Sequence, residues 1–231
     1  YIGSKDPTLI ENIWRIVEKD EKIDHFEQNS THVPTGLQKI FDEILVNATD
    51  NKERTQKLAA TDESVQVTKN IKVNISEDGT IVVYNDGDGL PVVEHAEKKV
   101  LMPEMVFGTL LTSGNYKKDE EKTWGGRNGY GAKLANIFSL RFEVETVDHR
   151  RKKKFKQVWT DHMSEPAQKA KVTSYSSKPY TEIRFLPDYA YFGMKSGITP
   201  EMIDLVRKRT IDMAGWLDKS VSVFFQDVKV P

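Results

Sequence analysis

The chain of 231 residues contains no cysteine, which excludes disulfide bridges and thiolate metal sites and suits an intracellular protein. It also lacks any apolar run close to the ~20 residues that a membrane-spanning helix requires, so no membrane association is expected. No signal peptide is present, and the first residue is Tyr1 rather than Met. The sequence is therefore expected to be a trimmed fragment of a longer protein.

An excess of charge of either sign is also missing. Lysine and arginine number 34 against 35 acidic residues, which gives a net charge of −1. A global electrostatic attraction to nucleic acid is therefore absent, although local patches are compatible with this balance. Hydrophobic residues make up 38% and charged residues 30% of the chain, as in globular proteins, and the length allows one large or two small domains.

Hydrophobic periodicity and turn residues predict a mixture of strands and helices. The mixture favours one α/β domain with helices stacked on a largely antiparallel or mixed sheet. The expected strands are 12–18, 23–28, 71–76, 80–85, 141–147, 155–160, 172–175, 181–186 and 220–225. Helices are expected from Pro34 to about Arg54, over 105–111 and over 200–217, with an exposed connection at 55–70 and a long polar loop at 112–128.

A glycine-rich stretch, GGRNGYGAKLANIFS, runs from Gly125 to Ser139. Glycines let backbone N–H groups converge on an anion, and the helical pattern that follows adds the partial positive charge of a helix N-terminus. This is the chemistry of a phosphate-binding loop. A Walker A loop is excluded because Lys133 stands one place too late after Gly131, and no third glycine completes a Rossmann fingerprint at Gly87 and Gly89.

The helix after Pro34 has two contiguous faces. At ~100° per residue an apolar arc should face the sheet, and it consists of Leu37, Ile40, Phe41, Ile44, Leu45 and Ala48. The adjoining arc carries Glu43, Asn47, Asp50 and Asn51 without a basic partner. Such a face is either solvated or a site for a hard cation such as Mg²⁺, which takes one or two protein oxygens beside phosphates and water.

A third polar motif, NDGDGLP, covers Asn85 to Pro91 at the end of an expected strand. Asp-Gly clusters mark turns in most proteins, so a plain turn is one interpretation. The other is a ligand site, in which a buried Asp accepts a hydrogen bond from an adenine amino group and the glycines allow the base to approach closely.

Together these motifs carry a family resemblance. The order Glu-x-x-x-Asn, Asp-x-Gly-x-Gly, glycine-rich lid and Thr strand resembles the Bergerat (GHKL) ATP-binding fold. The longer stretches KIFDEILVNATDN, GLPVVEH, FGTLLTSGNY, GGRNGYGAKLANIFS and FKQVW resemble the ATPase domain of eukaryotic-type (type IIA) DNA topoisomerase II. The likeness covers essentially the whole chain. It implies an α+β, two-layer sandwich, with a mixed sheet and helices on one face, as a single domain over residues 1–231.

The resemblance also implies roles for individual residues. Glu43 is expected to be the general base that activates the attacking water, Asn47 to bind Mg²⁺, and Asn51 to hold the phosphate end of ATP. Asp86 is expected to receive the adenine amino group, and Gly89, Leu90 and Thr181 to line the base pocket. The lid and the glycine-rich segment are expected to bind ribose and phosphates through Ser113, Asn115, Arg127, Asn128, Gly129, Tyr130, Gly131, Ala132 and Lys133.

At the level of the whole protein, the resemblance implies an ATP-operated gate that captures duplex DNA, acts as a homodimer and resides in the nucleus. The transducer and DNA breakage–reunion domains are expected to be absent from this chain, which should therefore bind nucleotide, hydrolyse it slowly and be monomeric. The alternative is an ATP-switched DNA clamp of the same fold that does not cleave. A chaperone ATPase is disfavoured by the lid sequence.

Two further features are interpreted more plainly. The basic run RRKKKFK, from Arg150 to Lys156, joins two expected strands. It is either a solvated turn or a contact for a DNA phosphate backbone. The large side chains of Trp14, Trp159 and Trp216 are expected in the core.

Overall fold

The computed structural model describes residues 2–20, 23–96, 98–109, 130–166 and 169–230. The helices of this part of the chain are α1 (Thr35–Ala59), α2 (Met102–Gly108), α3 (Gly131–Ile137) and α4 (Pro200–Trp216). The strands are β1 (Thr8–Asp20), β2 (Ile23–Val33), β3 (Asn70–Ile75), β4 (Ile81–Asp86), β5 (Ser139–Asp148), β6 (Lys153–Thr160), β7 (Glu165–Pro166), β8 (Lys171–Ser174), β9 (Tyr180–Pro187), β10 (Ser222–Phe225) and β11 (Val228–Lys229).

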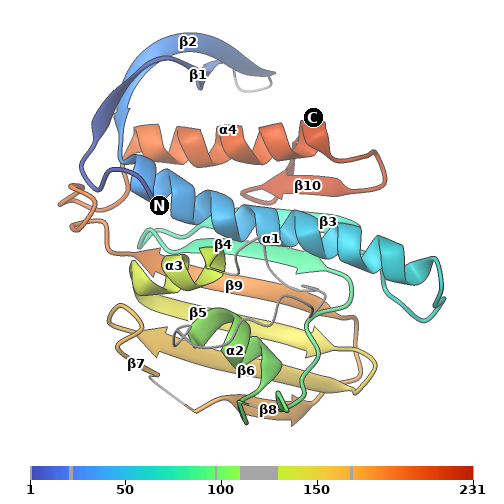
Figure 1. Ribbon diagram of the computed structural model, residues 1–231. Helices are drawn as coiled ribbons and strands as arrows, with labels where there is room; N and C mark the ends of the chain where they lie inside the picture. The colour runs from blue at the N-terminus through green and yellow to red at the C-terminus, as the bar shows by residue number, and fades with distance from the viewer. Residues whose placement is uncertain (1, 21–22, 97, 110–129, 167–168, 231) are drawn as a thin grey trace, which may run out of the picture.

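Nine of these strands form one mixed sheet (Figure 1). Its order is β11-β10-β3-β4-β9-β5-β6-β7, and β8 pairs with β6 beside β7 at the same edge. The pairing of β10 with β3 is parallel, and the other pairings are antiparallel. The expected mixed sheet is confirmed.

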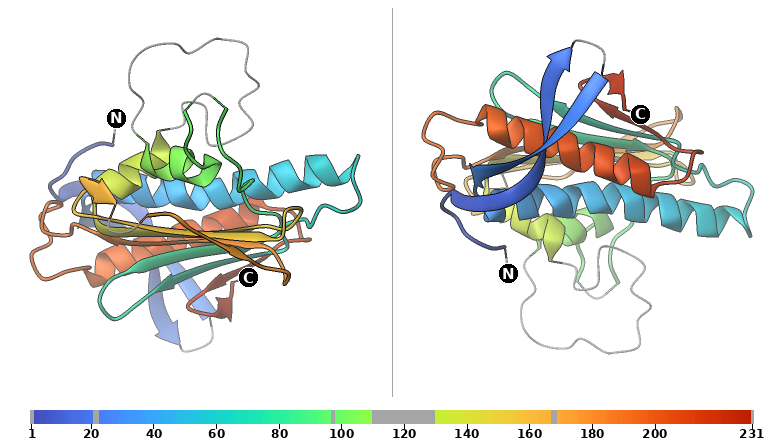
Figure 2. Two further views of the ribbon diagram at one scale, coloured as in Figure 1. Left: turned by 90° about the horizontal axis from the view of Figure 1, so that it is seen from below. Right: turned by 90° about the horizontal axis from the view of Figure 1, so that it is seen from above.

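The helices cover one face of this sheet and leave the other open (Figure 2). The strand residues that point toward the helices are fully or almost fully buried, as Ile71, Val83, Val144 and Phe155 illustrate. On α1 the whole expected apolar arc is buried, each residue at 3% exposure or less. The two-layer arrangement therefore follows from burial of one face of the sheet and one stripe of each long helix.

Aromatic rings fill the centre of the core. Phe142 on β5 is fully buried, and its ring lies 6.1–6.3 Å from those of Phe107, Trp159 and Phe185 in tilted arrangements. Edge-to-face and tilted ring pairs of this kind add to the stabilisation from buried apolar area. The side chain of Phe142 thus links α2 and β5 to the two strands that neighbour β5, which are β6 and β9.

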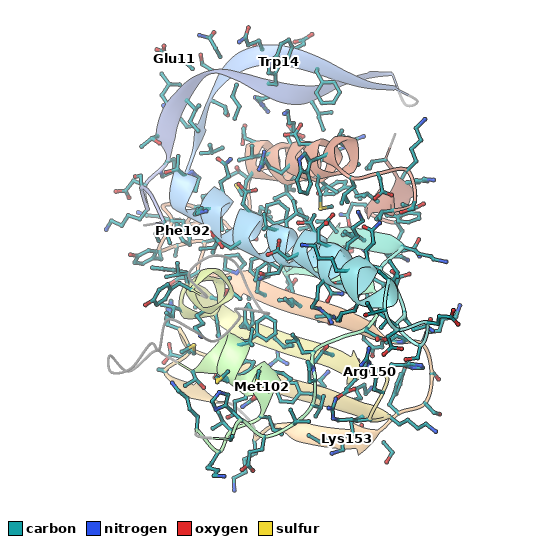
Figure 3. All side chains as sticks on the ribbon, turned by 45° about the vertical axis from the view of Figure 1, so that its right-hand side comes forward. Glu11, Trp14, Met102, Arg150, Lys153 and Phe192 are labelled. Atoms are coloured by element: carbon teal, nitrogen blue, oxygen red, sulfur yellow. The ribbon has the colours of Figure 1, made fainter. Side chains whose placement is uncertain are left out.

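Strands β1 and β2 form a separate two-stranded ribbon that arches over α4 (Figure 1). Arg15 on the ribbon donates to Asp204 on α4 at 2.9 Å. The expected core position of Trp159 is confirmed, but those of Trp14 and Trp216 are wrong, since their side chains are 51% and 73% exposed. Trp14 lies on the ribbon (Figure 3), which is too narrow to bury an indole, and Trp216 is the last residue of α4.

Most expected elements are present with shifted ends. Helix α1 continues to Ala59, because Thr55 is fully buried and its hydroxyl donates to the carbonyl of Asn51 at 2.8 Å. Helix α2 begins three residues early, with Pro103 in its first turn, where a missing N–H costs nothing. The short strands β7 and β11 were not expected. No helix in the described ranges has the length and apolarity to cross a bilayer.

The core predicts a large cost for truncating its central ring. Phe142→Ala should lower the free energy of unfolding by about 3–5 kcal/mol, because it leaves a cavity among three other rings. Trp216→Ala, which removes an exposed indole, should change stability by no more than about 0.5 kcal/mol. Urea unfolding followed by circular dichroism measures both. Equal destabilisation by the two changes would contradict this view of the core.

Candidate functional site

The polar arc of α1 lies beside the arc that binds the helix to the sheet. Glu43, Asn47 and Asn51 occur at four-residue intervals, so their side chains lie one above another on successive turns. All three are partly exposed rather than fully solvated. Within the described ranges the Asn47 amide forms no hydrogen bond, so its oxygen is available to an external ligand.

The carboxylate of Glu43 is fixed from two sides. Lys39, one turn earlier, approaches Glu43 Oε1 with its ammonium nitrogen at 2.6 Å, and the Glu43 side chain is only 17% exposed. On the other side lies Gly131, the first residue of α3, where an added Cβ would overlap the Glu43 carboxyl group. A side chain at position 131 would therefore displace the Glu43 carboxyl group, and this carboxylate faces the backbone at the start of α3.

Negative charge accumulates along this part of α1. The pKa of Asp50 is raised by partial burial and by the nearby negative charges of Glu43 and Glu53. Within the described ranges no three acidic or histidine side chains converge as in a protein-only metal site. The donors therefore fit Mg²⁺ bound by one amide oxygen, with its remaining ligands from phosphate and water, and do not fit a metal held by protein alone.

Asn51 belongs to a network that the sequence analysis missed. Its amide oxygen accepts from Arg54 at 2.6 and 3.2 Å, and its amide nitrogen donates to Thr68 Oγ1 at 3.2 Å. The Arg54 guanidinium also donates to the carbonyl oxygens of Asp88 and Gly89, and burial lowers its pKa to about 10. Arg54 thus joins α1 to the Asp-Gly loop. Its position three residues after Asn51, on the same helix face, was the available signal.

The carboxylate of Asp86 does not point toward α1, contrary to expectation. Its Oδ1 accepts from the backbone N–H groups of Lys69 and Asn70 at 2.6 and 2.8 Å, and its Oδ2 accepts from the Asn70 amide at 2.6 Å. Side chains alternate along a strand, so the neighbouring Asn85 faces the helices with Ile81 and Val83. Asn85 is 4% exposed and takes the position that was assigned to Asp86.

Asn85 begins a polar row that crosses three strands on the helix-facing side of the sheet. It pairs in register with Thr181 on β9, which pairs with Thr146 on β5. The two threonine hydroxyls are 2.8 Å apart, and Thr146 Oγ1 also accepts from the backbone N–H of Leu90 at 3.1 Å. Asn85 and Thr146 were not expected in the site. The signal that identifies them is a row of three hydrogen-bonding side chains on neighbouring strands of the buried face.

The Asp-Gly loop closes tightly onto this row. The Gly89 N–H donates to the Val147 carbonyl at 3.1 Å, and an added Cβ on Gly89 would overlap the Thr146 hydroxyl. Glycine is therefore required by the close approach of the loop to β5. The structure thus places Gly89, Leu90 and Thr181 around the Thr146 hydroxyl.

Residues 130–133 lead into α3 from the glycine-rich stretch. Tyr130 is 47% exposed, whereas Ala132 and Lys133 are buried at 8% and 7% exposure. Burial lowers the pKa of Lys133, and the positive charge of Lys98 lowers it further. The other residues expected in the lid and phosphate loop, Ser113, Asn115, Arg127, Asn128 and Gly129, lie outside the described residues.

No protein-family model matches the chain. It is 44% identical over 216 residues to DNA topoisomerase 2 of Penicillium chrysogenum, covering 93% of this chain and 13% of the relative. It is 43% identical over 231 residues to DNA topoisomerase 2 of Arabidopsis thaliana, covering 100% of this chain and 15% of the relative.

Solved structures place the likeness within those long relatives. The crystal structure of the ATPase region of Saccharomyces cerevisiae topoisomerase II superposes with a TM-score of 0.83 at 42% identity, covering 99% of this chain and 57% of that one. The chain belongs to the ATPase region of the eukaryotic DNA topoisomerase II family. The ATPase and transducer domains from Balamuthia mandrillaris give a TM-score of 0.84 at 38% identity, covering 100% of this chain and 56% of that one.

A hollow of about 770 Å³ on the open face of this topoisomerase II ATPase fold does not suit a nucleotide. Five carboxylates line it against three cations. Glu143 binds Arg141 and Lys156 at 2.8 and 2.5 Å, so the positive groups are already neutralised. Excess negative charge disfavours a polyphosphate here. The α1 side, with its amides and glycines, remains the candidate site.

The hydrogen bonds of Asp86 predict a structural rather than a ligand-binding effect in this topoisomerase II relative. Asp86→Ala leaves two backbone N–H groups without their charged acceptor and should lower the free energy of unfolding by about 1–3 kcal/mol. Asp86→Asn, which keeps one acceptor oxygen, should cost less. Thermal and urea unfolding measure both. An unchanged free energy of unfolding for Asp86→Ala would show that these hydrogen bonds do not stabilise the fold.

Proposed function

We propose that this chain binds Mg·ATP between α1 and the sheet and hydrolyses it, as the nucleotide-operated gate of a type II DNA topoisomerase. The observation that carries the proposal is the contact of Glu43 with Gly131. It brings a fixed carboxylate to the end of a glycine-rich segment, where a phosphate-binding backbone meets a base. The likeness to ATPase regions of topoisomerase II supports the same function.

The base of ATP is assigned to the end formed by β4 and the Asp-Gly loop. Asn85 is buried on the helix-facing side between Ile71 and Thr181, and its amide nitrogen donates to the Asp86 carbonyl at 3.0 Å. The amide oxygen can therefore accept from the adenine amino group. Thr181 adds a polar contact from β9, and Gly89 and Leu90 line the pocket. A buried acceptor of this kind discriminates strongly, because a ligand without the matching donor leaves it unpaired.

The phosphates are assigned to the other end, between α1 and the start of α3. Asn47 supplies the protein ligand of Mg²⁺, and Asn51 is held toward the same side by Arg54 and Thr68. Bound Mg²⁺ would neutralise the charge of the phosphates. The backbone of Tyr130 to Ala132 and the ammonium of Lys133 adjoin this end. Ser113, Asn115, Arg127, Asn128 and Gly129 complete the proposed site as sequence-based predictions.

Glu43 is the proposed general base. Its carboxylate accepts a proton from water while the water oxygen bonds to the γ-phosphorus and the bond between γ-phosphorus and the bridging oxygen breaks. The products are ADP and inorganic phosphate. The ammonium nitrogen of Lys39 lies 2.6 Å from Glu43 Oε1 and fixes the direction of the carboxylate. Such positioning, with charge stabilisation, is the main requirement of phosphoryl transfer.

The role in a whole protein is part of the proposal, because the chain spans about one seventh of the length of the curated relatives it matches. In such a protein, ATP binding would join two of these domains around a DNA duplex, and hydrolysis would reset the gate during strand passage in the nucleus. Residues 1–231 form one ATPase domain in this proposal, monomeric alone. The relatives are DNA topoisomerases, which favours this function over a clamp that does not cleave.

Asn85→Ala tests the adenine assignment. Loss of the buried acceptor should weaken ATP binding by about 10- to 100-fold, the equivalent of 1–3 kcal/mol for a broken buried hydrogen bond. GTP carries a carbonyl group in place of the adenine amino group and should compete poorly with ATP for the unmodified chain. Isothermal calorimetry measures these affinities, with Asp86→Asn as the matched control that leaves ATP affinity near its original value. Equal affinities for ATP and GTP would refute the assignment.

Glu43→Gln tests the base. The amide keeps the size and hydrogen-bonding capacity of the side chain but accepts no proton, so phosphate release should slow by about 10²- to 10⁴-fold. Mg·ATP affinity should change little. Asn47→Ala should instead weaken the Mg²⁺-dependent part of nucleotide binding, which separates the two roles.

The control for Glu43→Gln is Glu63→Gln, which removes an exposed carboxylate outside α1 and should leave turnover unchanged. Near-normal hydrolysis by Glu43→Gln would move the base elsewhere. Asp50, the next carboxylate on the polar arc, would then be tested as Asp50→Asn.

A further inference from the structure

The basic run from Arg150 to Lys156 divides into two groups in the structure. Four of its cations meet carboxylates. Arg150 binds Asp62 at 2.9 Å, Arg151 binds Asp148 at 3.0 Å, and Lys154 and Lys156 lie 2.5–3.6 Å from Glu143 or Glu145. Lys152 and Lys153 have no acidic partner in the part of the chain that the structure describes. Figure 3 shows Arg150 and Lys153 at the end of the sheet where β5 turns into β6.

Strand β8 brings further unpaired cations to the same place. Lys153 pairs in register with Ser174, and Lys156 pairs with Lys171. The N–H of Tyr175 donates to the Lys152 carbonyl at 2.8 Å, so the segment after β8, which includes Lys178, returns beside the turn. Lys171 and Lys178 are exposed and, among described residues, have no acidic partner. Four lysines from two strands, a turn and a loop therefore share one edge.

Hydroxyl groups lie between these lysines. Ser174, Ser176 and Ser177 are exposed, and their hydroxyls form no hydrogen bond to any residue that the structure describes. We name the basic edge as the set Lys152, Lys153, Lys171, Ser174, Ser176, Ser177 and Lys178. One feature disfavours a simple structural explanation of it. The cluster continues from β8 into the turn and the following loop, beyond the edge strand that lysines commonly protect.

We propose that the basic edge binds the phosphate backbone of duplex DNA. Lysine ammonium and serine hydroxyl groups are donors typical of phosphate contacts. Among the described residues, the edge offers one exposed aliphatic side chain, Val172 at 39% exposure, and one partly exposed ring, Tyr175, which packs edge-on against Tyr180. This is less apolar and aromatic surface than the centre of a protein–protein interface presents. The occupant is thus a polyanion with regularly spaced charges. This contact is separate from the ATP site and deepens the proposed function, because it names a surface of this domain that meets DNA.

The salt dependence of DNA binding tests the proposal. The probe is a fluorescent 20-base-pair duplex of arbitrary sequence, titrated with the chain between about 20 and 200 mM salt. Each lost lysine–phosphate contact should lower the slope of log affinity against log salt by about 0.9. The triple change Lys153→Thr, Lys171→Thr and Lys178→Ser, which keeps β-forming residues in the strands, should therefore lower the slope by about 2–3 and weaken binding at every salt concentration.

A charge-matched control removes three exposed lysines elsewhere, as Lys5→Ser, Lys195→Ser and Lys219→Ser. It should leave the slope close to that of the unmodified chain. Equal slopes for the two triple variants, or no DNA binding by the unmodified chain at 20 mM salt, would overturn the proposal. Binding of polyglutamate as tight as that of the duplex would assign the edge to an acidic protein instead. ATP affinity and melting temperature, measured in parallel, should be unchanged in both variants, so a failure of the ATP site is recognised separately.

Discussion

Burial of the apolar arc of α1 against the sheet is the constraint on which the rest of the structure depends. Leu37, Ile40, Phe41 and Ile44 are fully buried, and this fixes the rotation of the helix about its own axis. Once that rotation is fixed, the polar arc with Glu43, Asn47 and Asn51 must lie at the margin between helix and sheet. A packed core tolerates little rotation, because its side chains interdigitate at close to crystal density.

The same constraint connects the two ends of the proposed nucleotide site. At one end α1 approaches α3 so closely that a side chain at residue 131 would displace the Glu43 carboxyl group. At the other end the half-buried guanidinium of Arg54 holds Asn51 and the carbonyls of the Asp-Gly loop together. A rigid helix therefore sets the distance between the proposed base-binding and phosphate-binding regions. Preorganisation of this kind is what phosphoryl transfer requires of a protein.

The two faces of the sheet carry different kinds of side chain. The helix-facing side carries the polar row Asn85, Thr181 and Thr146, which lies where the proposed adenine site begins. The open side carries paired charges, with the Glu143 carboxylate neutralised by Arg141 and Lys156. Cations that this pairing does not use gather at the edge formed by β6 and β8. Nucleotide and DNA would thus contact different elements of one sheet.

Local patterns in the sequence were sufficient for the order of the long helices and strands and for the buried face of α1, because each depends on residues within a few turns or strand positions of one another. Local sequence could not decide whether Asn85 or Asp86 faces the helices, because both stand in one polar motif. The register of β4 with β9 decides it. Arg54, Thr68 and Thr146 surround the Asp-Gly loop and come from segments that are far apart in the chain. Such a network exists only after the sheet has formed, because strand pairing and helix packing bring these hydrogen-bonding groups within reach.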